Sequence, residues 1–161
     1  MGIGIPAGSR AGFSLLEVLV TLMLLSMVYA IALPSIGRTR IQASVHNSSQ
    51  AVMGTISLAK AAAVRFGRPS VLRLDSARDR IWVEVDTTLA GTGSTAALGY
   101  FSFREDLRVD LKANRTALCF DGRGVGTTRA ACPQAGAVII VALKQSADTV
   151  FVSPLGRVIT R

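Results

Sequence analysis

The distribution of apolar and polar residues predicts, near the start of the chain, a long helix that is apolar on every side. Residues 13–33 form a run of 21 positions in which Glu17 is the one residue that is charged at neutral pH. A helix of that length spans about 32 Å at ~1.5 Å per residue, which matches a hydrocarbon core of ~30 Å. We therefore expect a membrane-spanning helix.

Beyond this run the pattern changes to one apolar stripe with helical spacing. The stripe consists of residues three, four or seven positions apart, namely Ile41, Val45, Val52, Ile56, Ala59, Ala63 and Phe66. The opposite face carries polar side chains, namely Gln42, Asn47, Gln50 and Lys60. Gly67 and Pro69 form a stop signal. We expect one helix from about residue 14 to residue 66, bent or locally loosened near Pro34 and Gly37.

The remaining residues predict short strands. Residues 70–76 and 80–86 alternate between apolar and polar side chains, and the residues between them fit a hairpin turn. Further strand candidates are 100–103, 107–111, 116–120, 137–143, 149–152 and 156–160. Residues 87–99 are small and polar, which predicts a loop. Strands that follow one long helix predict an α+β fold, with an antiparallel sheet packed against that helix.

Charge and composition limit the partners and the kinds of site that we expect. The formal net charge is +8, and 15 of the 18 basic residues are arginine. This balance favours anionic lipid or nucleic acid as a partner, unless the basic surface is merely solvated. The chain has one histidine, His46, on the expected helix, and two cysteines that form no C-x-x-C pair. Zinc binding and a Ser-His-Asp or Cys-His arrangement are therefore disfavoured, and we expect no metal, cofactor or small-molecule substrate.

The start of the apolar run resembles the class III signal of type IV pilins and pseudopilins. A short leader ends in Gly12, and the sequence FSLLE follows at 13–17 and opens the apolar run. Ala11 stands where a basic residue is usual, and Ser14 stands where threonine is common. An ordinary secretory signal peptide is the alternative, with AIA at 30–32 as its cleavage site, but the apolar run is longer than such signals require.

The resemblance implies that a prepilin peptidase cuts after Gly12 and that the new N-terminal residue, Phe13, is N-methylated. Glu17 then becomes the fifth residue of the mature chain and pairs with the α-amino group of a neighbouring subunit, which fixes subunit register in a filament. The alternative for Glu17 is a carboxylate that reaches the membrane interface without a partner. Pro34 stands at mature position 22, where the family commonly has a proline that kinks the helix.

The C-terminal third resembles the GspH/FimT group of minor pilins and pseudopilins. The resemblance rests on CFDGRGVG at 119–126, AVIIVAL at 137–143 and TVFVSPLGRVITR at 149–161. It implies a subunit of a type II secretion pseudopilus or of a type IV pilus. An enzyme anchored in the membrane is a third class, for which the head offers no nucleophile–base pair.

Some members of the GspH/FimT group bind DNA through a C-terminal G-R-x-R element. Gly156 and Arg157 match this element, but Ile159 replaces its second arginine and the next arginine is Arg161. On a strand, residues 157 and 161 point to the same face about 13 Å apart. Arg123 and Arg129 on a neighbouring turn are added as candidates for the same basic patch. Duplex DNA is thus an alternative partner.

Residues 121–126, DGRGVG, resemble a phosphate-binding loop superficially, but they lack the terminal Lys-Ser/Thr and a following helix, so a turn is favoured. Cys119 and Cys132 lie 13 positions apart around this turn. In an exported head they would form a disulfide that contributes about 3 kcal/mol; the alternative is two buried free thiols.

These expectations combine into a type IV pilin-like structural subunit without catalytic activity. Its parts are a leader peptide at 1–12, a transmembrane and filament-core helix at 13–34, an amphipathic helix at 35–67 and a periplasmic β-rich head at 68–161. We expect a single-pass protein of the bacterial inner membrane. Its partners are other pilin or pseudopilin subunits, the prepilin peptidase/methyltransferase and the membrane.

Overall fold

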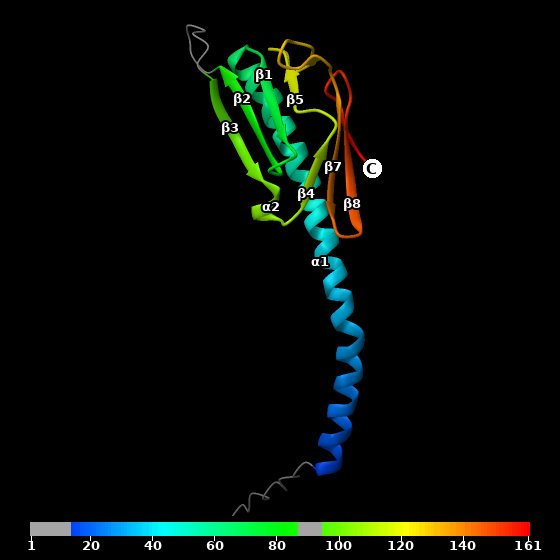
Figure 1. Ribbon diagram of the computed structural model, residues 1–161. Coiled ribbons are helices and arrows are strands. Elements are labelled where there is room, and N and C mark those ends of the chain that lie inside the picture. The colour runs from blue at the N-terminus through cyan, green and yellow to red at the C-terminus, as the bar shows by residue number, and fades with distance from the viewer. Residues whose placement is uncertain (1–13, 87–94) are drawn as a thin grey trace, which may run out of the picture. The chain divides into compact units, whose positions relative to one another are not determined.

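The computed structural model describes residues 14–86 and 95–161 (Figure 1). The chain divides between Thr39 and Arg40 into two compact units. The first contains the start of helix α1, which spans Leu15–Phe66. The second contains the rest of α1 and the strands, and we call it the head. The predicted long helix is thereby confirmed.

In the first unit, α1 exposes apolar side chains on every side. Leu15 is 79% exposed and Ile31 is 78% exposed, and none of the segment Leu15–Ala32 is buried. With a mean hydropathy of 2.3, this segment is long and apolar enough to cross a membrane. The helix assignment continues through Pro34. The expected bend near Pro34 and Gly37 stays a prediction.

Two hydroxyl groups in this segment are satisfied by the helix itself. The carbonyl of Ser14 accepts the N–H groups of Glu17 and Val18 at 3.0 and 3.2 Å. The hydroxyls of Thr21 and Ser26 donate to carbonyls of the preceding turn, at 2.9 and 2.7 Å. These bonds suit a helix in lipid or protein, where water cannot serve as the partner.

In the head, α1 buries one face. Val52, Ile56, Ala59 and Ala63 of the predicted stripe are fully buried. Three polar residues that the stripe did not include are buried with them, namely Ser48, Ser49 and Thr55. Their hydroxyls donate at 2.8–2.9 Å to carbonyls one turn earlier, so burial leaves no unpaired donor there.

The predicted stop at Gly67 is a Schellman motif. Gly67 has φ +62°, its N–H donates to the carbonyl of Val64 at 3.2 Å, and the N–H of Arg68 donates to that of Ala63 at 3.1 Å. The Ser70 hydroxyl then donates to the carbonyl of Ala59 at 2.7 Å, which ties the first strand to the helix.

Nine strands and one short helix follow within the described residues. They are β1 (Ser70–Asp75), β2 (Arg80–Asp86), β3 (Thr95–Ser102), α2 (Phe103–Asp106), β4 (Asp110–Ala113), β5 (Ala117–Phe120), β6 (Gly126–Thr127), β7 (Ala137–Leu143), β8 (Ser146–Val152) and β9 (Val158–Thr160). They form two antiparallel sheets, in the orders β3-β2-β1-β5-β6 and β4-β7-β8-β9. Both sheets lie against the head part of α1 (Figure 1), and the helix and sheets share one core. The predicted α+β class is confirmed, with two sheets where one was expected.

Several boundaries differ from the predictions. β8 begins at Ser146 and not at residue 149, β9 begins at Val158 and not at residue 156, and β6 was not predicted. Residues 95–99, expected in a loop, belong to β3, because pairing with β2 satisfies the backbone of these small residues. Residues 87–94 of that expected loop lie outside the described residues. Phe103, expected in a strand, begins α2, and the strand expected at 107–111 begins at Asp110. The carbonyl of Phe103 accepts the N–H groups of Leu107 and Val109, which turns the chain between the two sheets.

Asp79 fixes this turn from the β1–β2 hairpin, a role that the sequence pattern did not indicate. It has φ +53° and is 2% exposed. Its carboxylate accepts the N–H of Leu111 at 2.8 Å and pairs with Arg104 at 2.7 Å, and its carbonyl accepts the N–H of Phe103 at 2.9 Å. One buried carboxylate therefore joins the hairpin to both α2 and β4.

Candidate functional site

The predicted processing site adjoins the start of α1. Gly12 and Phe13 lie outside the described residues, so cleavage and N-methylation stay predictions. Glu17 lies in the first helical turn with an exposed side chain, and its carboxylate makes no hydrogen bond within the described ranges. An acid in the first turn interacts favourably with the positive end of the helix dipole. The carboxylate is also free to meet a partner.

The disulfide between Cys119 and Cys132 is formed, with the two Cα atoms 5.8 Å apart. Both cysteines are buried in a small cluster with Ala117, against which Val71 packs. Arg129 and Cys132 exchange two backbone hydrogen bonds of 2.9 Å, which closes the disulfide-bonded loop. The alternative of two free thiols is therefore wrong for this structure.

The DGRGVG segment is a turn that leads from β5 into β6, as predicted. An oxygen of the Asp121 carboxylate accepts the N–H groups of Arg123 and Val125 at 2.9 Å each. The bond from Val125 is the largest cause of a lowered Asp121 pKa; desolvation opposes it, and the Arg123 N–H and the charges of Arg123 and Arg129 add to it. Both arginines thus lie near one carboxylate.

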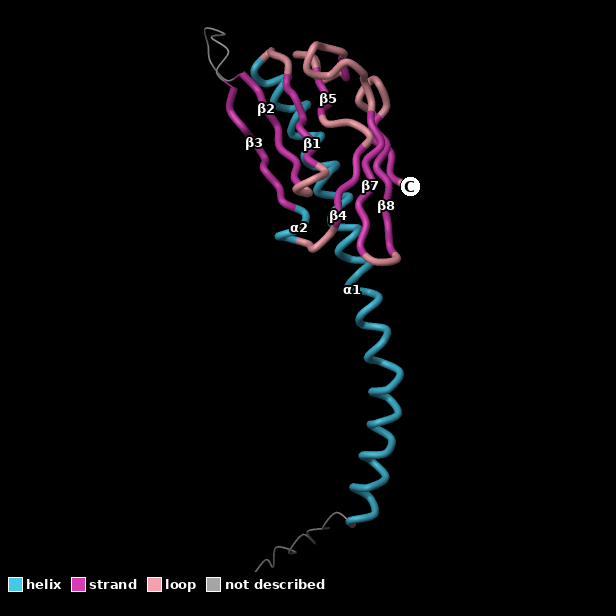
Figure 2. Tube along the Cα trace, viewed as in Figure 1, coloured by secondary structure: helices cyan, strands magenta, loops and turns pink. Residues whose placement is uncertain are grey.

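Two turns meet at the same end of the head (Figure 2). At Gly126, an added Cβ would clash with the carbonyl of Pro154 and come within 3.2 Å of the Gly156 nitrogen. Gly156 has φ +84°, and a Cβ there would lie 3.1 Å from both Lys60 Cε and a ring carbon of Phe120. The chain therefore brings the Arg123 turn against the turn that precedes Arg157.

Arg157 and Arg161 flank β9, and both are exposed. The N–H of Ser153 donates to the Arg157 carbonyl at 2.8 Å, and Arg161 exchanges backbone bonds of 3.0 and 3.2 Å with Thr149. This extended pairing places both arginines on the outer side of the sheet together with Ile159, while Val158 packs against the core.

The candidate arginines differ from four other arginines of the head, which form ion pairs. Ion pairs within the described part of the chain involve Arg68, Arg73, Arg80 and Arg104. Arg123, Arg129, Arg157 and Arg161 have no such partner there. Asp121 lies near Arg123 and Arg129 and offsets part of their charge, whereas Arg157 and Arg161 have no acid in an ion pair with them among these residues. The same described residues contain no cluster of three or more His, Cys, Asp or Glu side chains that could hold a metal ion.

Comparisons with known proteins bear on the N-terminal segment. Residues 8–33 match the family described as "Prokaryotic N-terminal methylation motif". This match confirms the part of the pilin resemblance that rests on the leader and the apolar run. No curated protein matches the chain in sequence.

Among solved structures, the chain is similar to the type IV minor pilin FimU of Pseudomonas aeruginosa strain PAO1 in two crystal forms. In space group P21 the identity is 15%, the match covers 78% of this chain and 90% of that chain, and the TM-score is 0.49. In space group P65 the identity is 13%, the coverage is 74% and 91%, and the TM-score is 0.47.

Proposed function

We propose that the protein is a minor pilin or pseudopilin of the GspH/FimT type, a structural subunit of a filament anchored in the bacterial inner membrane. The observation that carries this proposal is the match of residues 8–33 to the methylation motif. Within this motif, the described segment Leu15–Ala32 is helical and exposes apolar side chains on every side. The same signal serves type II secretion pseudopili and type IV pili. The genes that neighbour its gene would distinguish the two: secretion genes would indicate a pseudopilus, and pilus genes would indicate a type IV pilus.

In this proposal, prepilin peptidase removes residues 1–12 and Phe13 is then methylated. Residues 13–34 form the membrane and filament-core helix, residues 35–67 form the amphipathic helix that continues from it, and the β-rich part of the head at 68–161 lies in the periplasm. The disulfide supports this location, because such bonds persist in oxidising compartments. Glu17 pairs with the terminal ammonium of a neighbouring subunit, which compensates a carboxylate held away from water.

The test is the intact mass of the protein purified from membranes of a host with a prepilin peptidase. We expect residues 13–161 plus one methyl group. Gly12→Val should leave the leader attached, whereas Ala11→Val, beside the cleaved bond, should still be processed. A chain that starts at Leu33 would show an ordinary signal peptide and refute the proposal.

DNA binding is a second candidate function. The specific observation is that Arg157 and Arg161 lie on one exposed side of the β9 region without ion pairs in the described residues, beside the Arg123 turn. Such a surface would contact phosphates independently of base sequence. The isoleucine at 159, where the DNA-binding members carry arginine, counts against this function.

The test is titration of the full chain in neutral detergent with duplex DNA at several salt concentrations. Each lost phosphate contact should reduce the slope of log K against log salt by about 0.9. Arg157→Ala with Arg161→Ala should reduce affinity and slope, while Arg78→Ala, on the β1–β2 hairpin, should change neither. Unchanged binding by the double variant would exclude this surface.

A further inference from the structure

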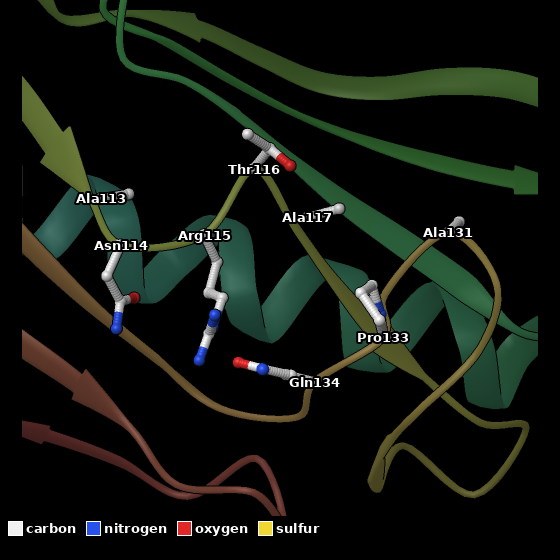
Figure 3. A pocket seen from close by; sticks show the side chains of 8 residues that line it. All are labelled: Ala113, Asn114, Arg115, Thr116, Ala117, Ala131, Pro133 and Gln134. Carbon is white, nitrogen blue, oxygen red and sulfur yellow. The ribbon is translucent and has the colours of Figure 1, made fainter.

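A recess of about 260 Å³ lies between the β4–β5 connection and the disulfide-bonded loop (Figure 3). Asn114, Arg115 and Thr116 line one side of it, and Pro133 and Gln134 line the other. The connection is the place where the chain passes from one sheet to the other, since β4 and β5 belong to different sheets.

Arg115 is held firmly at this crossing by its neighbours. The N–H of Asn114 donates to the carbonyl of Val138 at 3.1 Å, in one sheet. The carbonyl of Thr116 accepts the N–H of Leu74 at 2.9 Å, in the other sheet. The backbone on both sides of Arg115 is therefore fixed, and its side chain reaches into the recess (Figure 3).

The guanidinium of Arg115 lacks an acceptor. Its Nε is buried and has no hydrogen-bond partner, and the side chain forms no ion pair among the described residues. A buried donor without an acceptor is unfavourable, and more so when it is charged. The side chain as a whole is only half-buried, and the terminal nitrogens beyond the buried Nε point into the recess (Figure 3), where an anionic ligand would accept from them.

The other polar groups of the recess are neutral amides. Asn114 Oδ1 accepts the N–H of Val138 at 2.9 Å, which leaves the NH₂ group of that side chain free to donate. Gln134 points its amide oxygen toward Arg115 across the recess (Figure 3), and the opposite orientation of this amide presents two further N–H donors to a ligand. No carboxylate lines this recess.

Two acids that line a neighbouring hollow with Arg115 are already engaged. Arg115 also borders a hollow that contains Glu84 and Asp75. Glu84 accepts from Arg73 at 3.0 Å and from Trp82 at 2.9 Å. Asp75 accepts the N–H groups that follow it in the hairpin turn. Neither acid supplies the missing acceptor.

We propose that this recess is a binding site for a carboxylate, which accepts two parallel hydrogen bonds from Arg115 and further ones from the amides of Asn114 and Gln134. A planar guanidinium matches a carboxylate in this bidentate way. One positive charge with neutral donors suits a monoanion better than a phosphate, which carries about −1.5 to −2 at neutral pH. The source is an acidic side chain of another protein or a small free carboxylate.

The disulfide is part of the site. Cys132 directly precedes Pro133 and Gln134 in the sequence, and its bond to Cys119 on β5 holds this wall of the recess against the sheet. The site belongs to the head alone, so it can fail while the pilin assignment stands, and the reverse also holds.

The experiment is ¹⁵N-resolved NMR of the full chain in neutral detergent micelles, observing the Nε–H signal of Arg115. Arg115→Lys assigns that signal by its disappearance. The probes are sodium acetate and the peptide acetyl-Gly-Glu-Gly-amide, with acetyl-Gly-Gln-Gly-amide and sodium chloride as controls. We expect a saturable shift with the carboxylate probes and no saturable shift with the controls. Tighter binding of the Glu peptide than of acetate assigns a protein side chain as the source; equal affinity assigns a free carboxylate.

Two variants and a reductant sharpen the test. Gln134→Ala should weaken acetate binding several-fold, and Arg115→Lys should weaken it about tenfold, measured on the Asn114 side-chain amide signals. Arg108→Lys, exposed between α2 and β4, should leave it unchanged. Reduction of the disulfide should weaken binding in parallel. A linear response, an equal response to the Gln peptide, tighter binding of inorganic phosphate, or unchanged affinity in both recess variants would overturn the proposal.

Discussion

The two units of the molecule use apolar residues in opposite ways. Between Leu15 and Ala32, helix α1 is apolar on every side and none of it is buried. In the head, the same helix confines its apolar residues to one stripe, and Val52, Ile56 and Ala59 are fully inaccessible to solvent. The first arrangement requires lipid or other subunits as a surrounding, whereas the second supplies its own core.

The two units also differ in how their acidic side chains are paired. The N-terminal unit has one acid within its apolar run, Glu17, and its carboxylate has no hydrogen-bond partner among the described residues. The head pairs its acids internally, as in Arg73 with Glu84 and Arg104 with Asp79. Substitutions in the first unit should therefore change assembly, and substitutions in the head should change folding. The chain's one tryptophan, Trp82, lies in the head, so its fluorescence reports head unfolding alone.

Glu17→Ala should give the largest effect, and only in assembly. If Glu17 faces the ammonium of a neighbouring subunit, its removal leaves that charge uncompensated in an apolar surrounding. Incorporation into filaments should then fall roughly a hundredfold or more. Site-specific crosslinking of filaments measures incorporation, and Trp82 fluorescence should show an unchanged head.

Thr21→Ala, one turn further along the same helix, is the matched control and should assemble normally. Normal incorporation of Glu17→Ala would show that the carboxylate has no partner.

Ile56→Ala should destabilise the head by about 2–5 kcal/mol, because it opens a cavity in a fully buried part of the core. Leu24→Ala removes a side chain of similar size from the exposed part of α1 and should leave the unfolding midpoint of the head unchanged. Urea titration of the full chain in neutral detergent, followed by Trp82 fluorescence, measures both. Equal midpoints for the two variants would contradict the division of α1.

Removal of the disulfide should cost the head about 3 kcal/mol, because a loop of this length is no longer constrained in the unfolded chain. The change is Cys119→Ala with Cys132→Ala, compared with the wild-type protein before and after reduction. Reduction should move the wild-type urea midpoint to that of the double variant. If reduction leaves the midpoint where it was, the bond does not stabilise the head.

Long, regular patterns could be predicted from the sequence, because their physical cause is local. Helix α1 follows from an apolar run and a stripe, and its end follows from Gly67. The strand at Ala137–Leu143 likewise follows from a continuous apolar run between turns. The division into two sheets could not be predicted, because it depends on the turn that Asp79 holds from a distant hairpin.

The candidate sites show the same limit. The cysteines and the DGRGVG turn are close in sequence, and spacing indicated both. The contact between Gly126 and the Pro154–Gly156 turn joins residues far apart in sequence. The sequence pattern did not indicate a binding site at Arg115, because a single arginine in a short connection between strands is usually exposed to solvent. Its unpaired Nε follows from the packing of chain segments that are distant in the sequence.

Asp79→Ala should destabilise the head by about 1–3 kcal/mol, because it leaves the Leu111 N–H without its acceptor and Arg104 without its buried partner. Asp79→Asn keeps an acceptor oxygen and tolerates the positive φ, so it should cost less. Urea titration with Trp82 fluorescence separates the two. If Asn costs as much as Ala, the charge and not the hydrogen bond to Leu111 holds the turn.

Glu84 should give the smallest effect and a characteristic pH dependence. Desolvation raises its pKa, but hydrogen bonds from Trp82 and Arg73 and the charge of Arg73 outweigh this and leave the pKa lowered. A carboxyl whose pKa is lower in the folded state adds stability above its unfolded pKa, about 4.3, and loses it as the pH falls through the folded value. The side chain is 27% exposed, so the contribution should be roughly 0.2–1 kcal/mol.

Glu84→Gln should therefore be less stable than wild type at pH 7, and the difference in stability should shrink below about pH 4. The measurement is the urea midpoint at each pH in detergent, and Glu17→Gln, in the other unit, should show no such difference at any pH. A gap between wild type and Glu84→Gln that persists at pH 3 would mean that shape, and not charge, distinguishes the two side chains.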